Sequence, residues 1–189
     1  MEYKIFLGYL TIVIAVIGYY PYFKDIFAGK TRPHIFSWLI WGLLNVIAFF
    51  AQVVAHSGAG TWITAFTAIA CLSIAALSFR RGEKHFTKID WLSLGGALLA
   101  MVLWRLTSQP LLAIILVTIA DAIGFVPTFR KSYYKPHEET AFMFALAALK
   151  FVVALFAIDS FTLTTALFPA SLVLTNASMV AMLLVRRKQ

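Results

Sequence analysis

The sequence predicts an all-α integral membrane protein in which seven transmembrane helices form two parallel three-helix repeats joined by a linker helix. Hydrophobic residues make up 61% and charged residues 13% of the 189 residues, and the mean hydropathy is +0.86. A water-soluble domain of this size does not carry such a composition. The chain also contains seven apolar runs, each close in length to the roughly 17–25 residues that cross a bilayer. One short sequence segment occurs twice.

The apolar runs leave almost no residues for a soluble domain. In chain order they cover approximately residues 5–22, 35–55, 61–79, 91–105, 111–129, 140–158 and 161–185. The first run is followed by Tyr20-Pro21-Tyr22 rather than by the small residues of a cleavage site, so we expect a retained helix instead of a signal peptide. The single cysteine, Cys71, excludes an intrachain disulfide.

A repeated sequence segment divides the chain into two similar halves. The stretch IGYYPYFKDIFAGKTRPH at residues 17–34 returns as IGFVPTFRKSYYKPH at residues 123–137. Its isoleucine, glycine, proline and phenylalanine recur at an offset of 106 residues. Three predicted helices separate the copies, so both copies run in the same direction, as in a parallel repeat. We therefore predict a first three-helix bundle (1–80), a linker with the fourth helix (81–107) and a second three-helix bundle (108–189).

Basic residues gather in alternate loops. Of the 16 Lys and Arg residues, 13 follow the first, third, fifth and seventh runs: Lys24, Lys30, Arg32, Arg80, Arg81, Lys84, Lys88, Arg130, Lys131, Lys135, Arg186, Arg187 and Lys188. By the positive-inside rule, the N-terminus lies outside and the C-terminus in the cytoplasm. We expect a bacterial or archaeal inner membrane. The net charge of +8 then reports topology and weak contact with membrane lipids, and we expect no nucleic-acid partner.

The order of three, one and three helices, with a proline and a basic loop after the first helix of each half, resembles the SWEET and PQ-loop superfamily of membrane transporters. The most similar stretch is FVPTFRKSYYKPHEET, residues 125–140. The resemblance implies that each bundle packs in the order first, third, second helix, and that the two bundles face each other across a central substrate path. In place of the family's Pro-Gln pair the chain has Pro21-Tyr22 and Pro127-Thr128.

The two repeated prolines fall near the inner ends of their predicted helices. A proline inside a helix removes one backbone hydrogen bond and clashes with the preceding turn, so the helix bends there. Gly18 and Gly124 precede Pro21 and Pro127 by about one turn. We interpret these four residues as paired hinges that let the inner halves of the helices move. The alternative is that the prolines simply end the helices.

Aromatic and polar side chains share one face of the predicted helix at 35–55. Trp38, Trp41 and Asn45 follow one another at helical spacings of 3 and 4 residues. A flat aromatic ring beside an amide offers stacking and directional hydrogen bonds to a small polar solute. The spacing W-x-x-W-x-x-x-N is also similar to a motif of PnuC-type nicotinamide riboside transporters, where we expect it in the second half. The alternative for Trp38 is the aromatic belt at the inner membrane surface.

Three further polar residues lie near the middle of predicted helices: Asp121, Lys150 and Asn176. A charge at this depth costs at least about 2.5–3.5 kcal/mol, so it must face a partner or water. Asp121 and Lys150 either pair, or Asp121 exchanges a proton during transport, as in some PQ-loop transporters. Asn176 is similar to the substrate-binding asparagine of SWEET-type carriers, although such an amide can also hold helices together.

These observations predict a facilitator or proton-coupled transporter for a small polar solute, bound by Trp38, Trp41, Asn45, Asp121, Lys150 and Asn176. A sugar, vitamin precursor, nucleoside or amino acid would suit this set, and an acid with a base could hold a zwitterion. The alternative is a non-transporting membrane receptor or assembly subunit on the same fold. We expect no enzymatic activity, cofactor or metal site, because no nucleotide-binding loop, nucleophile with a base or metal-ligand spacing occurs. No feature of the sequence indicates an oligomeric state.

Overall fold

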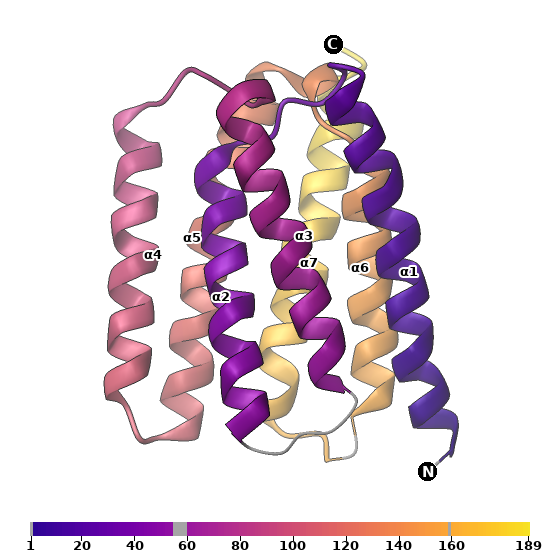
Figure 1. Cartoon of the computed structure of the whole chain (residues 1–189), viewed down its shortest axis with the longest axis vertical. Helices are drawn as coiled ribbons and strands as arrows, with labels where there is room; N and C mark the ends of the chain where they lie inside the picture. Colours follow the sequence, from indigo (N-terminus) through magenta and orange to yellow (C-terminus); the bar gives the residue numbers. More distant parts are fainter. Residues whose placement is uncertain (1, 55–59, 159) are drawn as a thin grey trace.

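The computed structural model describes residues 2–54, 60–158 and 160–189, and this part of the chain is helical, without strands (Figure 1). The helices run side by side along the long axis of the molecule. They are α1 (Glu2–Phe27), α2 (Ile35–Val54), α3 (Gly60–Arg81), α4 (Lys88–Leu106), α5 (Pro110–Tyr134), the short 3₁₀ helix η1 (Pro136–Glu138), α6 (Ala141–Ala157) and α7 (Leu163–Arg186). The all-α prediction is therefore confirmed for the described residues.

The apolar character of the helices fits an integral membrane protein. Within the described residues, five segments are long and apolar enough to cross a membrane: Phe6–Phe27, Thr64–Arg81, Lys88–Leu106, Leu111–Tyr134 and Leu163–Arg186. The apolar stretches of α2 and α6, Ile35–Phe50 and Ala141–Ala157, are shorter. Large apolar side chains point outward from several helices; Ile69, Leu92 and Leu174, for example, are 66%, 74% and 68% exposed. A soluble protein rarely presents so much apolar surface.

The helices form a ring with one helix outside it. In the first half of the chain α3 contacts both α1 and α2, and in the second half α7 contacts both α5 and α6. The ring is closed between the halves where α1 packs against α6 and α2 packs against α5. Helix α4 lies at one edge of the molecule and packs against α5 and α2 (Figure 1). Six helices therefore surround the centre of the molecule, which is where the candidate site lies.

Helices α1 and α5 continue beyond their internal prolines. Pro21 lies inside α1, which ends at Phe27, and Pro127 lies inside α5, which ends at Tyr134. The alternative that these prolines end their helices is therefore wrong, and the predicted ends at residues 22 and 129 were too early. A proline lacks one N–H donor but leaves its own carbonyl and the following residues free to continue the helical pattern.

Acidic side chains lie among the basic residues where α1, α3, α5 and α7 end, and we call this end of the molecule the basic end. The described acids there are Asp25, Glu83, Asp90, Glu138 and Glu139. The Arg130 guanidinium donates to both oxygens of the buried Asp90 carboxylate at 2.9 and 2.8 Å. Lys131 Nζ donates to Glu139 Oε2 at 2.6 Å, and both of these side chains are buried. Several of the basic residues therefore hold this end of the molecule together through ion pairs.

Other contacts at the basic end join the two halves of the chain. The Thr140 hydroxyl, just before α6, donates to Asp25 Oδ2 in α1 at 2.9 Å and contacts the Thr31 hydroxyl. The backbone N–H of Arg32 donates to the Glu138 carbonyl at 3.0 Å. Below these contacts the side chains of Tyr22, Ile26 and Leu183 are fully buried. The basic end is thus closed both by polar contacts and by close packing.

The buried histidine at the basic end predicts a pH-dependent stability. His34 lies just before α2 and is fully buried, and burial lowers its pKa from 6.5 to about 4 despite the nearby Asp90 carboxylate. The unfolded chain takes up this proton near pH 6.5, whereas the folded protein does so only near pH 4. The free energy of unfolding is therefore not reduced by His34 above pH 6.5. As the pH falls toward 4, protonation of His34 in the unfolded chain lowers this free energy by about 3 kcal/mol.

Thermal unfolding of the detergent-solubilised protein across this pH range will test the expectation. The wild type should lose stability between pH 6.5 and 4 more steeply than His34→Gln, whose side chain does not titrate. Equal pH slopes for the two proteins would contradict this role of His34.

Candidate functional site

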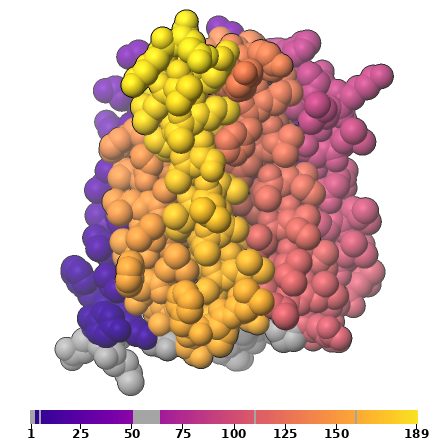
Figure 2. Space-filling view, turned by 180° about the vertical axis from the view of Figure 1, so that it is seen from behind, coloured from indigo at the N-terminus to yellow at the C-terminus, as the bar shows by residue number. Residues whose placement is uncertain are grey.

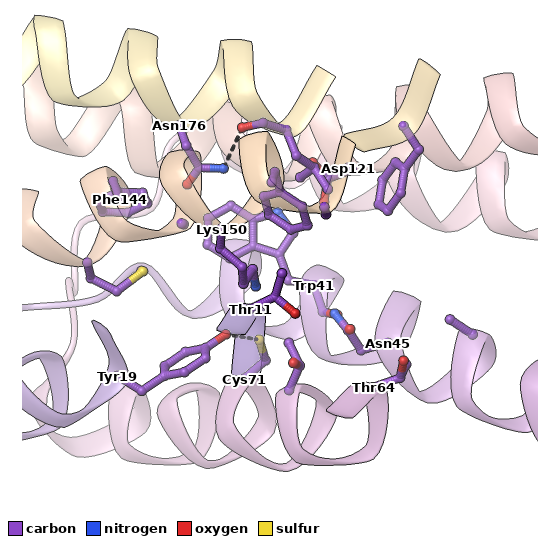
Figure 3. Close-up of a pocket in the computed structure, with 18 of the residues that line it drawn as sticks. Thr11, Tyr19, Trp41, Asn45, Thr64, Cys71, Asp121, Phe144, Lys150 and Asn176 are labelled. Atoms are coloured by element: carbon purple, nitrogen blue, oxygen red, sulfur yellow. Dashed lines mark hydrogen bonds between the residues drawn. The ribbon is translucent and has the colours of Figure 1, made fainter. Parts of the chain in front are cut away.

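A cavity of about 310 Å³ lies at the centre of the helix ring (Figure 3). All six residues that the sequence singles out for substrate binding line it: Trp38, Trp41, Asn45, Asp121, Lys150 and Asn176. They come from α2, α5, α6 and α7, so both halves of the chain contribute. Several other lining residues were not predicted from the sequence: Thr11, Tyr19, Thr64, Thr67, Cys71, Phe144 and Phe151.

Aromatic rings form one continuous wall of the cavity. The rings of Trp38 and Trp41 meet edge to face with centroids 5.2 Å apart, and Trp41 lies 4.6 Å from Phe125 of α5. Trp38 is only 1% exposed, and its indole N–H donates to the Tyr22 hydroxyl at 3.1 Å. The alternative that Trp38 belongs to the aromatic belt at the inner membrane surface is therefore wrong, because its side chain is buried inside the helix ring. The wall offers flat apolar faces to a ligand.

The two asparagines present hydrogen-bond acceptors to the cavity. Asn45 Nδ2 donates to the Trp41 carbonyl and Asn176 Nδ2 donates to the Leu172 carbonyl, each at 2.8 Å and each four residues back on the same helix. These bonds occupy one donor of each amide. Among the described residues, no hydrogen bond is recorded to either side-chain oxygen. The amide oxygens are therefore available as acceptors for a ligand.

Asp121 and Lys150 both line the cavity without pairing. Asp121 is 6% exposed on α5. The Lys150 ammonium on α6 lies 4.4 Å from the centroid of the Phe151 ring. Within the part of the chain that the structure describes, neither side chain has an ion-pair partner. The alternative of a buried ion pair between them is therefore wrong, and the cavity holds one acidic and one basic group that are separate.

A hydroxyl and a thiol meet on the opposite wall. The Tyr19 hydroxyl of α1 lies 3.6 Å from Cys71 Sγ of α3, and Figure 3 shows this contact beside Thr11 and below Lys150. No signal in the sequence separates Tyr19 from an outward-facing tyrosine such as Tyr20, because both lie in the same apolar helix. Only the packing of α1 against α3 brings Tyr19 and Cys71 to the cavity.

The four predicted hinge residues lie in α1 and α5, on the side of the cavity that faces the basic end. Gly18 and Gly124 are buried, Pro127 is buried and Pro21 is half-buried. Each of the two glycines faces a helix of the other half of the chain, and the approach is closer at Gly124 than at Gly18. A Cβ at Gly124 would lie 3.0 Å from Ile40 Cγ2 and 3.1 Å from Trp41 Nε1, whereas a Cβ at Gly18 would lie 3.4 Å from Leu146 Cβ. The hinge role itself stays a prediction.

Alanine at Gly124 is expected to destabilise the protein by about 1–3 kcal/mol, because the added methyl group would force Trp41 and Ile40 to move. Gly18→Ala is the matched control, since its methyl group meets only ordinary contacts and alanine favours a helix over glycine. Thermal unfolding of both variants in detergent measures the difference. The same loss of stability in the two variants would contradict the tight α2–α5 contact.

No family model, curated protein or solved structure matches the chain. Its function is therefore inferred from the cavity and the helices around it.

Proposed function

We propose that the protein is a membrane transporter that moves a small polar solute by alternating access around the central cavity. The observation that carries this proposal is the unpaired acid and base, with two amides, on the wall of one cavity inside an apolar helix ring. Charged groups at the depth of a bilayer are costly and usually mark a path for a substrate or ion. A merely structural bundle would gain nothing from keeping them there.

The packing of the helices supports a two-repeat transporter like those of the SWEET and PQ-loop superfamily. Residues 1–80 and 108–189 then form the two bundles, with 81–107 as the linker. Helix α3 lies against α1 and α2 as α7 lies against α5 and α6. In the repeat, α5 corresponds to α1 and α6 corresponds to α2. The contact between α1 and α6 therefore corresponds to the contact between α5 and α2, as expected from an approximate two-fold axis between parallel repeats.

The cavity and the closed basic end together resemble one state of an alternating-access cycle. The cavity reaches from Trp38 and Met143 toward Thr11, Ala48 and Ala154, which lie nearer the opposite end of their helices. With the basic loops in the cytoplasm, this state is closed on the cytoplasmic side. The other state requires the contacts between α1 and the start of α6 to open. Gly18, Pro21, Gly124 and Pro127 are placed to accommodate that movement in α1 and α5.

Asp121 is the residue that we propose to couple transport to protons. Its carboxylate is the acid of the cavity and has no described cation beside it, so a proton or a ligand can occupy it in turn. The equivalent position in the first half is Ala15, so the two halves would contribute unequally to coupling.

Uptake by reconstituted vesicles tests the proposed function. Vesicles containing the wild type should accumulate or equilibrate at least one radiolabelled solute from a panel of sugars, nucleosides, vitamin precursors and amino acids. Asn176→Ala should abolish this uptake, because it removes an acceptor from the cavity wall. Thr175→Val is the matched control on the neighbouring position of α7, since the Thr175 hydroxyl donates to the Ser171 and Leu172 carbonyls of its own helix. Absence of uptake for every solute, by protein that remains folded, would overturn transport and favour a membrane receptor or assembly subunit.

A further inference from the structure

The proposed function leaves the kind of solute open, and the charges of the cavity restrict it. Resting on that function, we propose that the solute is a small zwitterion that carries an ammonium group and a carboxylate, as a free amino acid does. Asp121 and Lys150 occupy separate positions on the wall of one cavity, and their side chains form no ion pair with each other.

The two charges belong to different helices and different walls. Asp121 is on α5 with Phe125 one turn further along, and Lys150 is on α6 beside Phe151. Figure 3 shows both side chains directed toward the same central space. Because no described residue neutralises either charge, a ligand that supplies both opposite charges would complete two ion pairs at once.

Other ligand types would satisfy the cavity less well. A neutral sugar or nucleoside would displace water from both charges without replacing it by an opposite charge, which leaves two uncompensated ions. A simple cation would meet Asp121 and leave Lys150 uncompensated, and a simple anion would do the reverse. A zwitterion places an opposite charge beside each of the two ions.

The uncharged groups of the cavity agree with an ammonium group on the ligand. The amide oxygens of Asn45 and Asn176 add two acceptors to the Asp121 carboxylate. An ammonium group has three N–H donors and no acceptor, so it matches a site rich in acceptors. The rings of Trp41 and Phe125 line the same cavity as Asp121 and can stabilise a cation further through their faces. Lys150 then remains as the charged donor for the carboxylate.

The volume sets an upper limit on the ligand. The cavity of about 310 Å³ lies at the small end of the roughly 300–1,000 Å³ range of ligand pockets. A single amino acid fits this size, and its side chain would contact the aromatic wall. A long peptide would not fit inside the ring.

Binding to the purified full-length protein tests the inference separately from transport. The twenty standard amino acids are first compared with neutral sugars and nucleosides by thermal shift in detergent. For the amino acid with the largest shift, calorimetry then compares it with its amide, which lacks the carboxylate, and with its deaminated acid, which lacks the ammonium group. We expect each analogue to bind at least about ten-fold more weakly than the parent.

Two variants test which side chain binds the carboxylate of the ligand and which binds its ammonium group. Lys150→Met should remove the preference for the parent over its amide, and Asp121→Asn should remove the preference over the deaminated acid. Lys88→Met, at the exposed start of α4, should leave both preferences unchanged. The wild-type analogue series needs no variant, so the test survives if either substitution prevents folding.

The outcomes separate this inference from the proposed function. Binding of an amino acid without any uptake would support the zwitterion site and overturn transport. Uptake of a neutral solute, with no amino acid bound, would support transport and overturn the zwitterion. Equal affinity for the parent and either analogue would also overturn it, as would the absence of a thermal shift with every amino acid.

Discussion

Glu139→Gln is expected to lower the free energy of unfolding by about 3–5 kcal/mol, because it leaves the Lys131 ammonium buried without a counter-charge. The Lys131 side chain is 1% exposed and the Glu139 side chain is 0% exposed, and their 2.6 Å contact is an ion pair removed from water. The Glu138 carbonyl, which also accepts from Lys131 at 2.8 Å, cannot neutralise the charge. Thermal or denaturant unfolding in detergent measures the loss.

Two further variants identify the cause of that loss. Glu138→Gln is the matched control, because Glu138 pairs at 3.5 Å with an Arg32 side chain that is 54% exposed. Such an exposed pair contributes about 1 kcal/mol or less. Adding Lys131→Met to Glu139→Gln should restore much of the stability, since the unpaired charge is then gone. Similar losses in the Glu138 and Glu139 variants would contradict a buried, charge-dependent closure of the basic end.

Asp121→Asn is expected to abolish the response of solute uptake to a proton gradient. A gradient of one pH unit is worth about 1.4 kcal/mol per proton, which supports about ten-fold accumulation of a solute that is exchanged for one proton. Asparagine has the same shape as aspartate but cannot exchange a proton. Vesicles with the variant should therefore only equilibrate the solute that the uptake panel identifies, while wild-type vesicles concentrate it.

The control for this experiment is a charge change outside the cavity. Lys88→Met should accumulate the solute as the wild type does. If Asp121→Asn still responds to the gradient in full, Asp121 does not carry the proton. If the wild type shows no gradient response, the protein is a facilitator and the coupling proposal is withdrawn while transport stands.

The sequence predicted the helices well because each is defined by a long apolar run. Prediction was least accurate near Pro21 and Pro127, where α1 and α5 continue to Phe27 and Tyr134. Local rules treat a proline with following polar residues as a helix end. Here the following turns gain buried contacts at the basic end, such as the Lys131–Glu139 pair, and tertiary packing outweighs the local signal.

The polar part of the cavity could be predicted, whereas its apolar part could not. Asp121, Lys150, Asn45 and Asn176 are conspicuous because polar groups are costly in a bilayer, and the structure places all four on one cavity. An apolar residue such as Phe144 looks the same in the sequence whether it faces lipid or the cavity. The acid partners of the basic loops were missed for a related reason, since charges in loops are usually solvated.

We propose that the cavity opens alternately to the two sides of the membrane. Cys71 is the only cysteine of the chain, so Ala147→Cys in a Cys71→Ser background places a single thiol on the cavity wall. A membrane-impermeant thiol reagent is then applied to either face of reconstituted vesicles. We predict that the thiol is labelled from both faces and that bound solute slows labelling. Labelling from neither face, or from one face alone under all solute conditions, would contradict alternating access.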